Sequence, residues 1–373
     1  MNLLMLGGDT SVVRGEHRAF HNTLSEFSNY WDRIDILTHR IPGVARHNCF
    51  DNVTFYPSPW GKMMQPFFVW KRGRALVARE RYDLIVSHDY GFFLHGTGAR
   101  WLSQSSGVPH VSEIHHVDGY PRAANLRERM QPWLTRRFVS GAMSHSLGFR
   151  ITNESELRPL LLSWGVPPEQ LFLLYSLYLD FDVFRPEGTL IEYDAIFVGR
   201  LTPNKAPFLF LDGIAAVARK RDGLRVLIIG AGPLRARLRA RAAALGAAAR
   251  VEFRDWVAEP GEMADLYRRS HCLICTSFSE GGPRVVAEAL ACGVPVISTR
   301  VGLARELVQD GVTGFLVDWS PVDIAVRMEQ ILFNQDLRAR MALAAPRSVQ
   351  RFEKSRVLRD YALGYQDLVK SET

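Results

Sequence analysis

Residues 279–298, SEGGPRVVAEALACGVPVIS, decide the fold of this chain. An apolar run, HCLICTSF, precedes this stretch, and the stretch itself ends in a second apolar run, ACGVPVIS. The pattern is a buried strand, a glycine-rich turn, a helix, a second glycine turn and another buried strand. It predicts a right-handed crossover unit of a parallel sheet, in which ligands gather at the carboxyl ends of the strands. Glu280 falls at such an end.

Two carboxylates, Glu280 and Glu288, lie eight positions apart in this stretch. Eight residues are a little over two helical turns, so both carboxylates can face one side if Glu280 lies just before the helix. Gly281 and Gly282 permit a close backbone approach, Pro283 suits the first helical position, and the free amides that follow attract anions. The stretch therefore predicts a site for a polar, negatively charged ligand. On charge alone, two solvated surface glutamates are an equal alternative.

The segment EGGPRVVAEALACG, continued by VGLARELVQDGVTGFLV, resembles the signature of retaining glycosyltransferase family 4. This resemblance implies an α/β chain of the GT-B fold, in which two facing Rossmann-like domains with parallel sheets hold a nucleotide sugar in the cleft between them. We therefore expect an acceptor-side domain at 1–186 and a nucleotide-sugar-binding domain at 187–350. A C-terminal helix at 351–373 should cross back to the first domain.

Composition and length agree with a two-domain globular protein. The chain has 373 residues, of which 47% are hydrophobic and 23% are charged. The net charge of +7 divides almost evenly, with 20 Lys and Arg against 17 Asp and Glu in residues 1–186 and 26 against 22 afterwards. Neither half is a basic arm, so nucleic acid is not expected as the main partner.

The cysteines and apolar runs predict a cytoplasmic protein that does not span a membrane. Four cysteines in a chain of this length do not form a disulfide framework. Cys272 and Cys275 lie in an expected buried strand, where residues three apart point to opposite faces, so a zinc or redox role is not expected. The start, MNLLMLGGDT, lacks the basic flank of a signal peptide, and no window reaches about 18 apolar residues.

The first half alternates strands and helices. Strands are expected at 2–6, 34–38, 53–56 and 84–87, and a helix is expected at about 16–29. Gly15 precedes that helix, where the backbone could approach a diphosphate. The run VPHVSEIHH predicts another strand, and the resemblance places a donor-side histidine at His115, with His116 as the alternate. His110, His115 and His116 cannot converge on one metal ion from an extended strand.

Two segments of the first half mix aromatic and basic side chains. They are 63–81 and 122–139, the latter with four arginines beside Trp133. Such segments can lie on an anionic membrane surface, so peripheral membrane contact is one expectation. For the first segment we favour the alternative, in which Phe67, Phe68 and Trp70 are core residues of a helix.

From Tyr193 the strand–helix alternation restarts. Arg200 and Lys205, in GRLTPNK, follow a strand and match the basic pair of the family, so they should face the same carboxyl-end site as Glu280. Gly230 opens a G-x-G after the next strand, but the third glycine and the following acidic residue are absent, so a dinucleotide oxidoreductase is a weaker alternative.

The resemblance implies a set of site residues and a function. The expected catalytic residues are His115, Arg200, Lys205 and Glu280. The expected donor-binding residues are Gly15, Gly199, Arg200, Lys205, Gly230, Trp256, Glu280, Gly281, Gly282, Pro283, Arg284, Val285 and Glu288. The donor would be a UDP-sugar or GDP-sugar, with no metal or other cofactor, and the acceptor a saccharide or lipid-linked hydroxyl. An epimerase, a phosphorylase or a non-catalytic nucleotide-sugar-binding protein are the alternatives.

Overall fold

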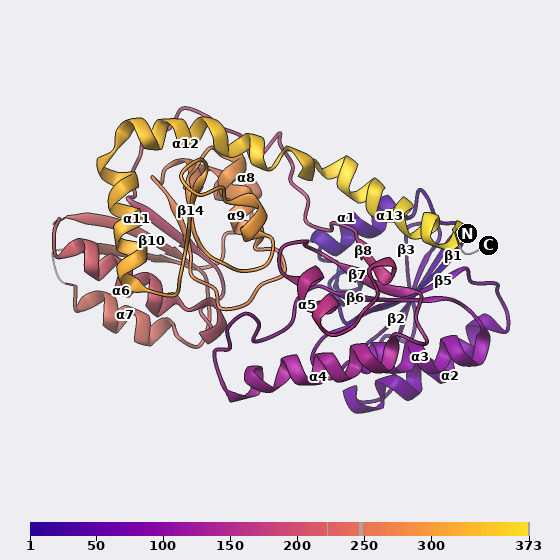
Figure 1. Cartoon of the computed structure of the whole chain (residues 1–373). Coiled ribbons are helices and arrows are strands. Elements are labelled where there is room, and N and C mark those ends of the chain that lie inside the picture. The colour runs from indigo at the N-terminus through magenta and orange to yellow at the C-terminus, as the bar shows by residue number, and fades with distance from the viewer. Residues whose placement is uncertain (222, 246–248, 372–373) are drawn as a thin grey trace. The chain divides into compact units, whose positions relative to one another are not determined.

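The computed structural model describes residues 1–221, 223–245 and 249–371 (Figure 1). It contains two compact units. The first unit comprises Met1–Val117, Gln131–Ser176 and Ser355–Thr373, and the second comprises Asp118–Met130 and Leu177–Lys354. The second unit thus begins at 177 rather than after 186, and it also includes 118–130, which the sequence had assigned to the first domain.

The first unit is built on an eight-stranded sheet with the order β3-β4-β2-β1-β5-β6-β7-β8. Its strands are β1 (Asn2–Leu6), β2 (Arg33–Thr38), β3 (His47–Cys49), β4 (Val53–Pro57), β5 (Leu84–His88), β6 (His110–Ile114), β7 (Gly148–Ile151) and β8 (Leu171–Leu173). All pairs are parallel except β3 with β4. The carboxyl ends of seven strands therefore meet at one edge.

Helices connect these strands. They are α1 (Ala19–Phe27), α2 (Gln65–Val77), α3 (Leu94–Ser106), α4 (Leu126–Ala142), α5 (Leu157–Ser163) and α13 (Lys354–Lys370), with 3₁₀ turns η1 (Val12–Arg14), η2 (Lys62–Met64) and η3 (Pro168–Gln170). Tyr361 and Tyr365 of α13 are buried and pack edge-on against Phe27 of α1. The C-terminal helix is thus part of the core of the first unit.

The second unit is built on a six-stranded parallel sheet with the order β11-β10-β9-β12-β13-β14. Its strands are β9 (Ala195–Val198), β10 (Leu224–Ile229), β11 (Ala249–Arg254), β12 (Leu273–Cys275), β13 (Val296–Thr299) and β14 (Gly314–Val317). The connecting helices are α6 (Pro207–Ala218), α7 (Arg235–Ala243), α8 (Pro260–Arg268), α9 (Arg284–Ala291), α10 (Ala304–Leu307), α11 (Pro321–Phe333) and α12 (Gln335–Ser348), with turns η4 (Pro203–Lys205) and η6 (Gln350–Phe352). The strand order reverses between β9 and β12, and doubly wound sheets bind ligands at such a reversal.

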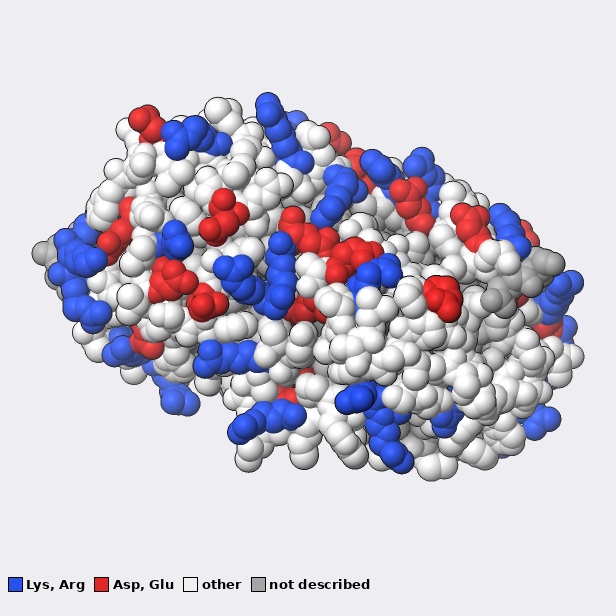
Figure 2. All heavy atoms as spheres, viewed as in Figure 1, with Lys and Arg blue, Asp and Glu red and all other residues white. Residues whose placement is uncertain are grey.

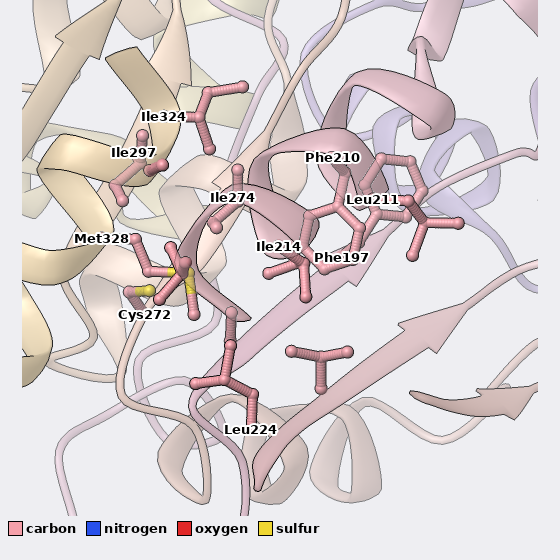
Figure 3. Packing of buried hydrophobic residues seen from close by; sticks show 14 of the residues in the cluster. Phe197, Phe210, Leu211, Ile214, Leu224, Cys272, Ile274, Ile297, Ile324 and Met328 are labelled. Carbon is pink, nitrogen blue, oxygen red and sulfur yellow. The ribbon is translucent and has the colours of Figure 1, made fainter. Parts of the chain in front are cut away.

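The core of the second unit is formed where α6 and α11 cover the sheet. Phe210 and Ile214 of α6 and Ile324 of α11 are fully buried (Figure 3). The rings of Phe197, on β9, and Phe210 lie 5.5 Å apart. These residues are apolar because parallel strands are covered on both faces.

Two expectations about helices need correction. The first helix begins at Ala19 rather than near residue 16, so Gly15 ends η1 with φ 77° and does not lie directly at the helix start. In α2, Phe68 is buried but Phe67 is 39% exposed, so only part of this aromatic group belongs to the core. In the described part of the chain, none of the helices is long and apolar enough to cross a membrane.

Phe210→Ala should lower the free energy of unfolding by about 3–5 kcal/mol, because truncation leaves a cavity in a fully packed core. Urea unfolding followed by circular dichroism measures this loss. Leu190→Ala is the matched control, since Leu190 is 87% exposed, and it should change the same quantity by less than about 0.5 kcal/mol. Equal effects of the two substitutions would contradict the packing described for α6.

Candidate active site

An ion pair lies at the carboxyl ends of β9 and β12, where the strand order of the second unit reverses. Lys205 ends η4, which follows β9, and Glu280 lies in the loop that follows β12. The Lys205 ammonium contacts Glu280 Oε1, and the two side chains are only 18% and 16% exposed. The structure therefore brings together two of the predicted catalytic residues from 75 positions apart.

Hydroxyl groups hold both partners of this pair. Ser277 Oγ donates to Glu280 Oε1 at 2.9 Å. Thr276 Oγ1 lies 2.9 Å from the carbonyl oxygen of Lys205 and 3.0 Å from that of Ala206. Ala206 has φ 46°, a left-handed conformation that is strained for a residue with a Cβ atom. The hydroxyl of Thr276 thus stabilises the strained turn that presents Lys205.

Two further side chains fix the backbone at Ser277. Thr299 Oγ1 donates to the Ser277 carbonyl oxygen at 2.6 Å, and Trp319 Nε1 donates to the same oxygen at 2.9 Å. Ser277 is buried, so this carbonyl group needs such partners. The loop that carries Glu280 is consequently tied to the ends of β13 and β14.

Positive charge exceeds negative charge at this position. Arg200 directly follows Gly199 in the loop after β9, is exposed, and forms no ion pair among the described residues. Burial is the largest effect on Lys205 and lowers its pKa to about 8, and the charge of Arg200 acts in the same direction. The contact with Glu280 favours the charged ammonium. An anion bound beside Arg200 and Lys205 would favour the charged ammonium further.

Glycines allow the loops around the pair to approach closely. A Cβ atom on Gly230, which follows β10, would lie 1.9 Å from the Gly199 carbonyl oxygen. A Cβ atom on Gly302 would lie 2.2 Å from the Glu280 carbonyl oxygen. Gly230 was predicted as a donor-binding residue, and the structure gives it a packing role between the loops after β9 and β10.

Helix α9 begins directly after the Glu280 loop. Pro283 is its N-cap residue rather than its first helical residue. Arg284 Nη1 donates to the carbonyl oxygen of Tyr178 at 2.8 Å, and its guanidinium lies 4.7 Å from the centre of the Tyr178 ring. Arg284 therefore fixes the segment that enters the second unit, and Val285 beside it is half-buried.

Glu288 lies one turn further along α9. The hydroxyl of Tyr267, from α8, donates to Glu288 Oε2 at 2.9 Å. Burial raises the pKa of Glu288. Among the described residues Oε1 has no hydrogen-bond partner, so this oxygen can accept a hydrogen bond from a ligand hydroxyl.

The remaining predicted residues are not partners in this ion pair. Trp256 is 71% exposed in the loop after β11. Packing does not require glycine at Gly282, because a Cβ atom there would meet only side chains, at 3.5 Å or more. Gly15 and His115 belong to the first unit. Cys272 and Cys275 are buried in the second unit, and no group of three His, Cys, Asp or Glu residues that could hold a metal ion occurs in the described ranges.

In the first unit, Glu113 of β6 is the centre of a buried network. Its Oε1 accepts hydrogen bonds from Arg150 Nη1 at 3.0 Å and from the hydroxyls of Tyr361 and Tyr365. His88 Nε2, at the end of β5, lies 2.5 Å from Oε2. Burial alone would raise the pKa of Glu113, but the charges of His88 and Arg150 hold it well below its usual value. The network therefore contains a buried carboxylate that is paired on both oxygens.

The same network sets the protonation of His115. Arg150 Nη1 donates to His115 Nε2 at 2.9 Å. A guanidinium only donates, so this contact favours the tautomer in which Nε2 accepts and Nδ1 carries the proton, while Nε2 also lies 3.5 Å from Glu113 Oε2. Burial lowers the pKa of His115 to about 4, so the ring is neutral at pH 7. The side chain is 44% exposed, and it can offer Nδ1–H to a ligand as a hydrogen-bond donor. His116, the alternate, is the next residue and is also half-buried.

Several residues of both sites were not found from the sequence. Thr276 and Ser277 lie directly before Glu280 in TSFSE, and hydroxyl residues between a strand and a predicted site could have been noted. Tyr267, Trp319 and Arg150 come from distant elements, and no local pattern marks them.

Arg150→Met should lower the free energy of unfolding by about 3–5 kcal/mol, because it leaves the buried Glu113 without its guanidinium partner. Urea unfolding at pH 7 measures the loss. The double variant Arg150→Met with Glu113→Gln should regain part of it, since no carboxylate is then buried without its guanidinium partner. Arg158→Met, which breaks a partly exposed pair with Glu154, is the control and should cost less than about 1 kcal/mol. Equal losses for Arg150→Met and Arg158→Met would rule out the buried network.

Comparison with known proteins identifies the family. Residues 185–348 match the family described as glycosyl transferases group 1, and residues 28–175 match a glycosyl transferase 4-like domain. A D-inositol 3-phosphate glycosyltransferase of Thermobispora bispora is 31% identical over 306 residues, which are 75% of this chain and 69% of that protein. The protein of the same name from Acidothermus cellulolyticus is 32% identical over 303 residues, and the match covers 75% of this chain and 66% of that relative.

A solved structure agrees with the fold. The crystal structure of Anabaena HepE in complex with UDP and glucose has a TM-score of 0.73, with 19% identity, and the match covers 98% of this chain and 100% of that one. The two parallel-sheet units and this likeness confirm the GT-B fold that was expected. The chain therefore belongs to the glycosyl transferases group 1, glycosyltransferase family 4.

Proposed function

We propose that this protein is a retaining glycosyltransferase that moves a sugar from a UDP-sugar or GDP-sugar to a hydroxyl of a saccharide or lipid-linked acceptor. The observation that carries the proposal is the Lys205–Glu280 pair beside the unpaired Arg200 at the strand reversal of the second unit. Two cations suit a diphosphate, and a carboxylate suits sugar hydroxyls. The likeness to a structure that contains UDP and glucose supports a nucleotide-sugar donor.

In the proposed reaction, the bond between the anomeric carbon and the diphosphate oxygen breaks, and negative charge grows on that oxygen. Arg200 and Lys205 stabilise this charge, because they are already in place and need no rearrangement. Glu280 accepts hydrogen bonds from donor-sugar hydroxyls, and Glu288 Oε1 accepts one from the ribose. The resemblance assigns His115 to the donor sugar, and its Nδ1–H suits a sugar oxygen.

The new glycosidic bond forms on the face from which the diphosphate leaves, so the anomeric configuration is retained. The acceptor hydroxyl gives its proton to the leaving phosphate oxygen, and no protein nucleophile takes part. We propose that the two cations supply the positive charge that other transferases take from a metal ion. Activity should then survive treatment with EDTA.

Acceptor and location are further parts of the proposal. Membership of the family favours bacterial polysaccharide, lipopolysaccharide or glycolipid synthesis at the cytoplasmic side of a membrane.

An epimerase, a phosphorylase or a binding protein without transfer activity is the alternative. Consumption of the nucleotide sugar only when an acceptor is present would support transfer over these alternatives.

Lys205→Ala and Glu280→Ala should each lower kcat by about 10²–10³-fold, since each removes a group that stabilises the transition state or holds the donor. Turnover of the nucleotide sugar with acceptor measures the loss, and the product's anomeric configuration is read by NMR. Lys220→Ala, which breaks an exposed pair with Glu329, is the matched control and should retain full activity.

The donor base is identified by thermal unfolding with UDP, GDP, ADP and NAD. Ligand at about 100 times its Kd adds roughly 2.7 kcal/mol of stability, enough for a clear shift. The shift should occur with one of UDP and GDP and should be lost in Lys205→Ala. A shift with NAD alone, or normal turnover in Lys205→Ala, would overturn the proposal.

Helix α4 supports peripheral contact with a membrane. Along α4, Leu126, Met130 and Trp133 are 76%, 60% and 65% exposed, at spacings of four and three that place them on one side of the helix. Its exposed arginines are Arg127, Arg129, Arg136 and Arg137. In Figure 2 blue side chains lie among white ones where α4 runs, with little red beside them. An apolar strip with flanking arginines is typical of helices that lie on anionic lipid.

The protein should therefore co-sediment with vesicles that contain phosphatidylglycerol and not with vesicles of phosphatidylcholine alone. Trp133→Ala should reduce the bound fraction, because it removes the largest exposed apolar side chain of α4. Phe333→Ala is the control, since Phe333 is 60% exposed in the second unit, and it should bind as the unchanged protein does. Equal binding to both kinds of vesicle would count against this part of the proposal.

A further inference from the structure

Three arginines line a cavity of about 680 Å³ in the first unit. Arg40 follows β2, Arg46 lies in the next loop, and Arg72 lies on α2. Tyr56 and Phe68, both buried, form part of the wall. We call this the arginine cavity.

The charges of the arginine cavity are not neutralised. No acidic residue lines it, and within the described ranges Arg40, Arg46 and Arg72 form no ion pair. The guanidinium of Arg72 lies 4.5 Å and that of Arg46 5.8 Å from the centre of the Tyr56 ring, so both are held near one aromatic wall. Three guanidinium groups around one cavity repel one another unless an anion lies between them. They are also the groups that bind phosphate and carboxylate with two parallel hydrogen bonds.

The arginine cavity lies at the same sheet edge as His115. It contacts the carboxyl ends of β2 and β4, and His115 follows the carboxyl end of β6. All these strands are parallel, and β2 is separated from β6 by β1 and β5. Three strand spacings amount to about 14 Å.

We propose that the arginine cavity binds a phosphate or carboxylate group of the acceptor substrate. That the ligand is the acceptor substrate rests on the proposed function, whereas the binding of an anion by the cavity does not. The distance implies an elongated acceptor, whose acidic group lies about 14 Å or more from the hydroxyl that reacts near His115. A small sugar phosphate cannot reach from one position to the other, so the acceptor is a longer acidic saccharide or a diphosphate-linked one.

Thermal unfolding of the full chain tests this assignment. The probes are inorganic pyrophosphate for the phosphate source and trigalacturonate for the carboxylate source, compared with chloride at equal ionic strength. They are added at saturating UDP and GDP, so that the diphosphate position at Arg200 and Lys205 is already occupied. The variants are Arg72→Gln and Arg40→Gln. Arg74→Gln is the matched control, because Arg74 is also on α2 but is exposed and stacks on Trp70 outside the cavity. Arg40 is exposed, and its side chain makes no hydrogen bond, ion pair or ring contact in the described ranges, so its substitution should leave the fold intact.

At least one probe should raise the Tm by several degrees in the unchanged protein and in Arg74→Gln. The rise should fall to less than half in Arg72→Gln and Arg40→Gln, and the probe that gives it identifies the acidic group. Equal rises in all four proteins, or no rise with either probe, would overturn the assignment. UDP and GDP, added separately, should include one that gives the same shift in all four proteins; the absence of any such shift would count against the proposed function and not against the cavity.

Discussion

The pairing of β9 with β12 is the constraint on which the candidate active site depends. Because these two strands are parallel neighbours, the loops that follow them leave the sheet side by side. One loop ends in Lys205 and the other carries Glu280, so the two charges meet although 75 positions separate them. Close approach of the adjoining loops then requires backbone without a Cβ atom, which Gly230 and Gly302 provide.

The carboxyl edge of the sheet in the first unit carries two different groups of charged side chains. At the ends of β5, β6 and β7, Glu113 is fully buried and is paired with His88 and Arg150. A buried charge without partners is costly, and the hydroxyls of Tyr361 and Tyr365 on α13 donate further hydrogen bonds to Glu113. At the ends of β2 and β4, Arg40 and Arg46 are exposed and Arg72 is half-buried, and no acidic residue lines the cavity that they share.

Under the proposed function, these two arrangements assign stability and acceptor binding to different strand ends of the first unit. Glu113 joins three strand ends to the C-terminal helix, which holds the sheet edge in one arrangement. Arg150, in the same network, donates to His115 Nε2 and so favours a proton on Nδ1. In the proposal above, acceptor binding is thereby separated from the positioning of His115, since different strand ends carry them.

Sequence patterns predicted the buried strands β1, β2, β4 and β5 and identified residues that follow strands. Buried strands are apolar runs, and the residues at their carboxyl ends, such as Glu280, Lys205 and His115, can be identified from local sequence alone. Family membership was expected from the resemblance of EGGPRVVAEALACG to the family signature, and the family matches confirm it.

Local sequence determined which side chains stand at the strand ends, because strand and helix periodicity act over a few residues. Only the tertiary structure decided which of these side chains meet and what they bind. Tyr361 and Tyr365 reach Glu113 across about 250 positions, and Arg150 reaches His115 across 35. The start of the first helix at Ala19 and the exposure of Phe67 were likewise set by packing. Hydrogen bonds and ion pairs between distant elements depend on strand order, which no local pattern encodes.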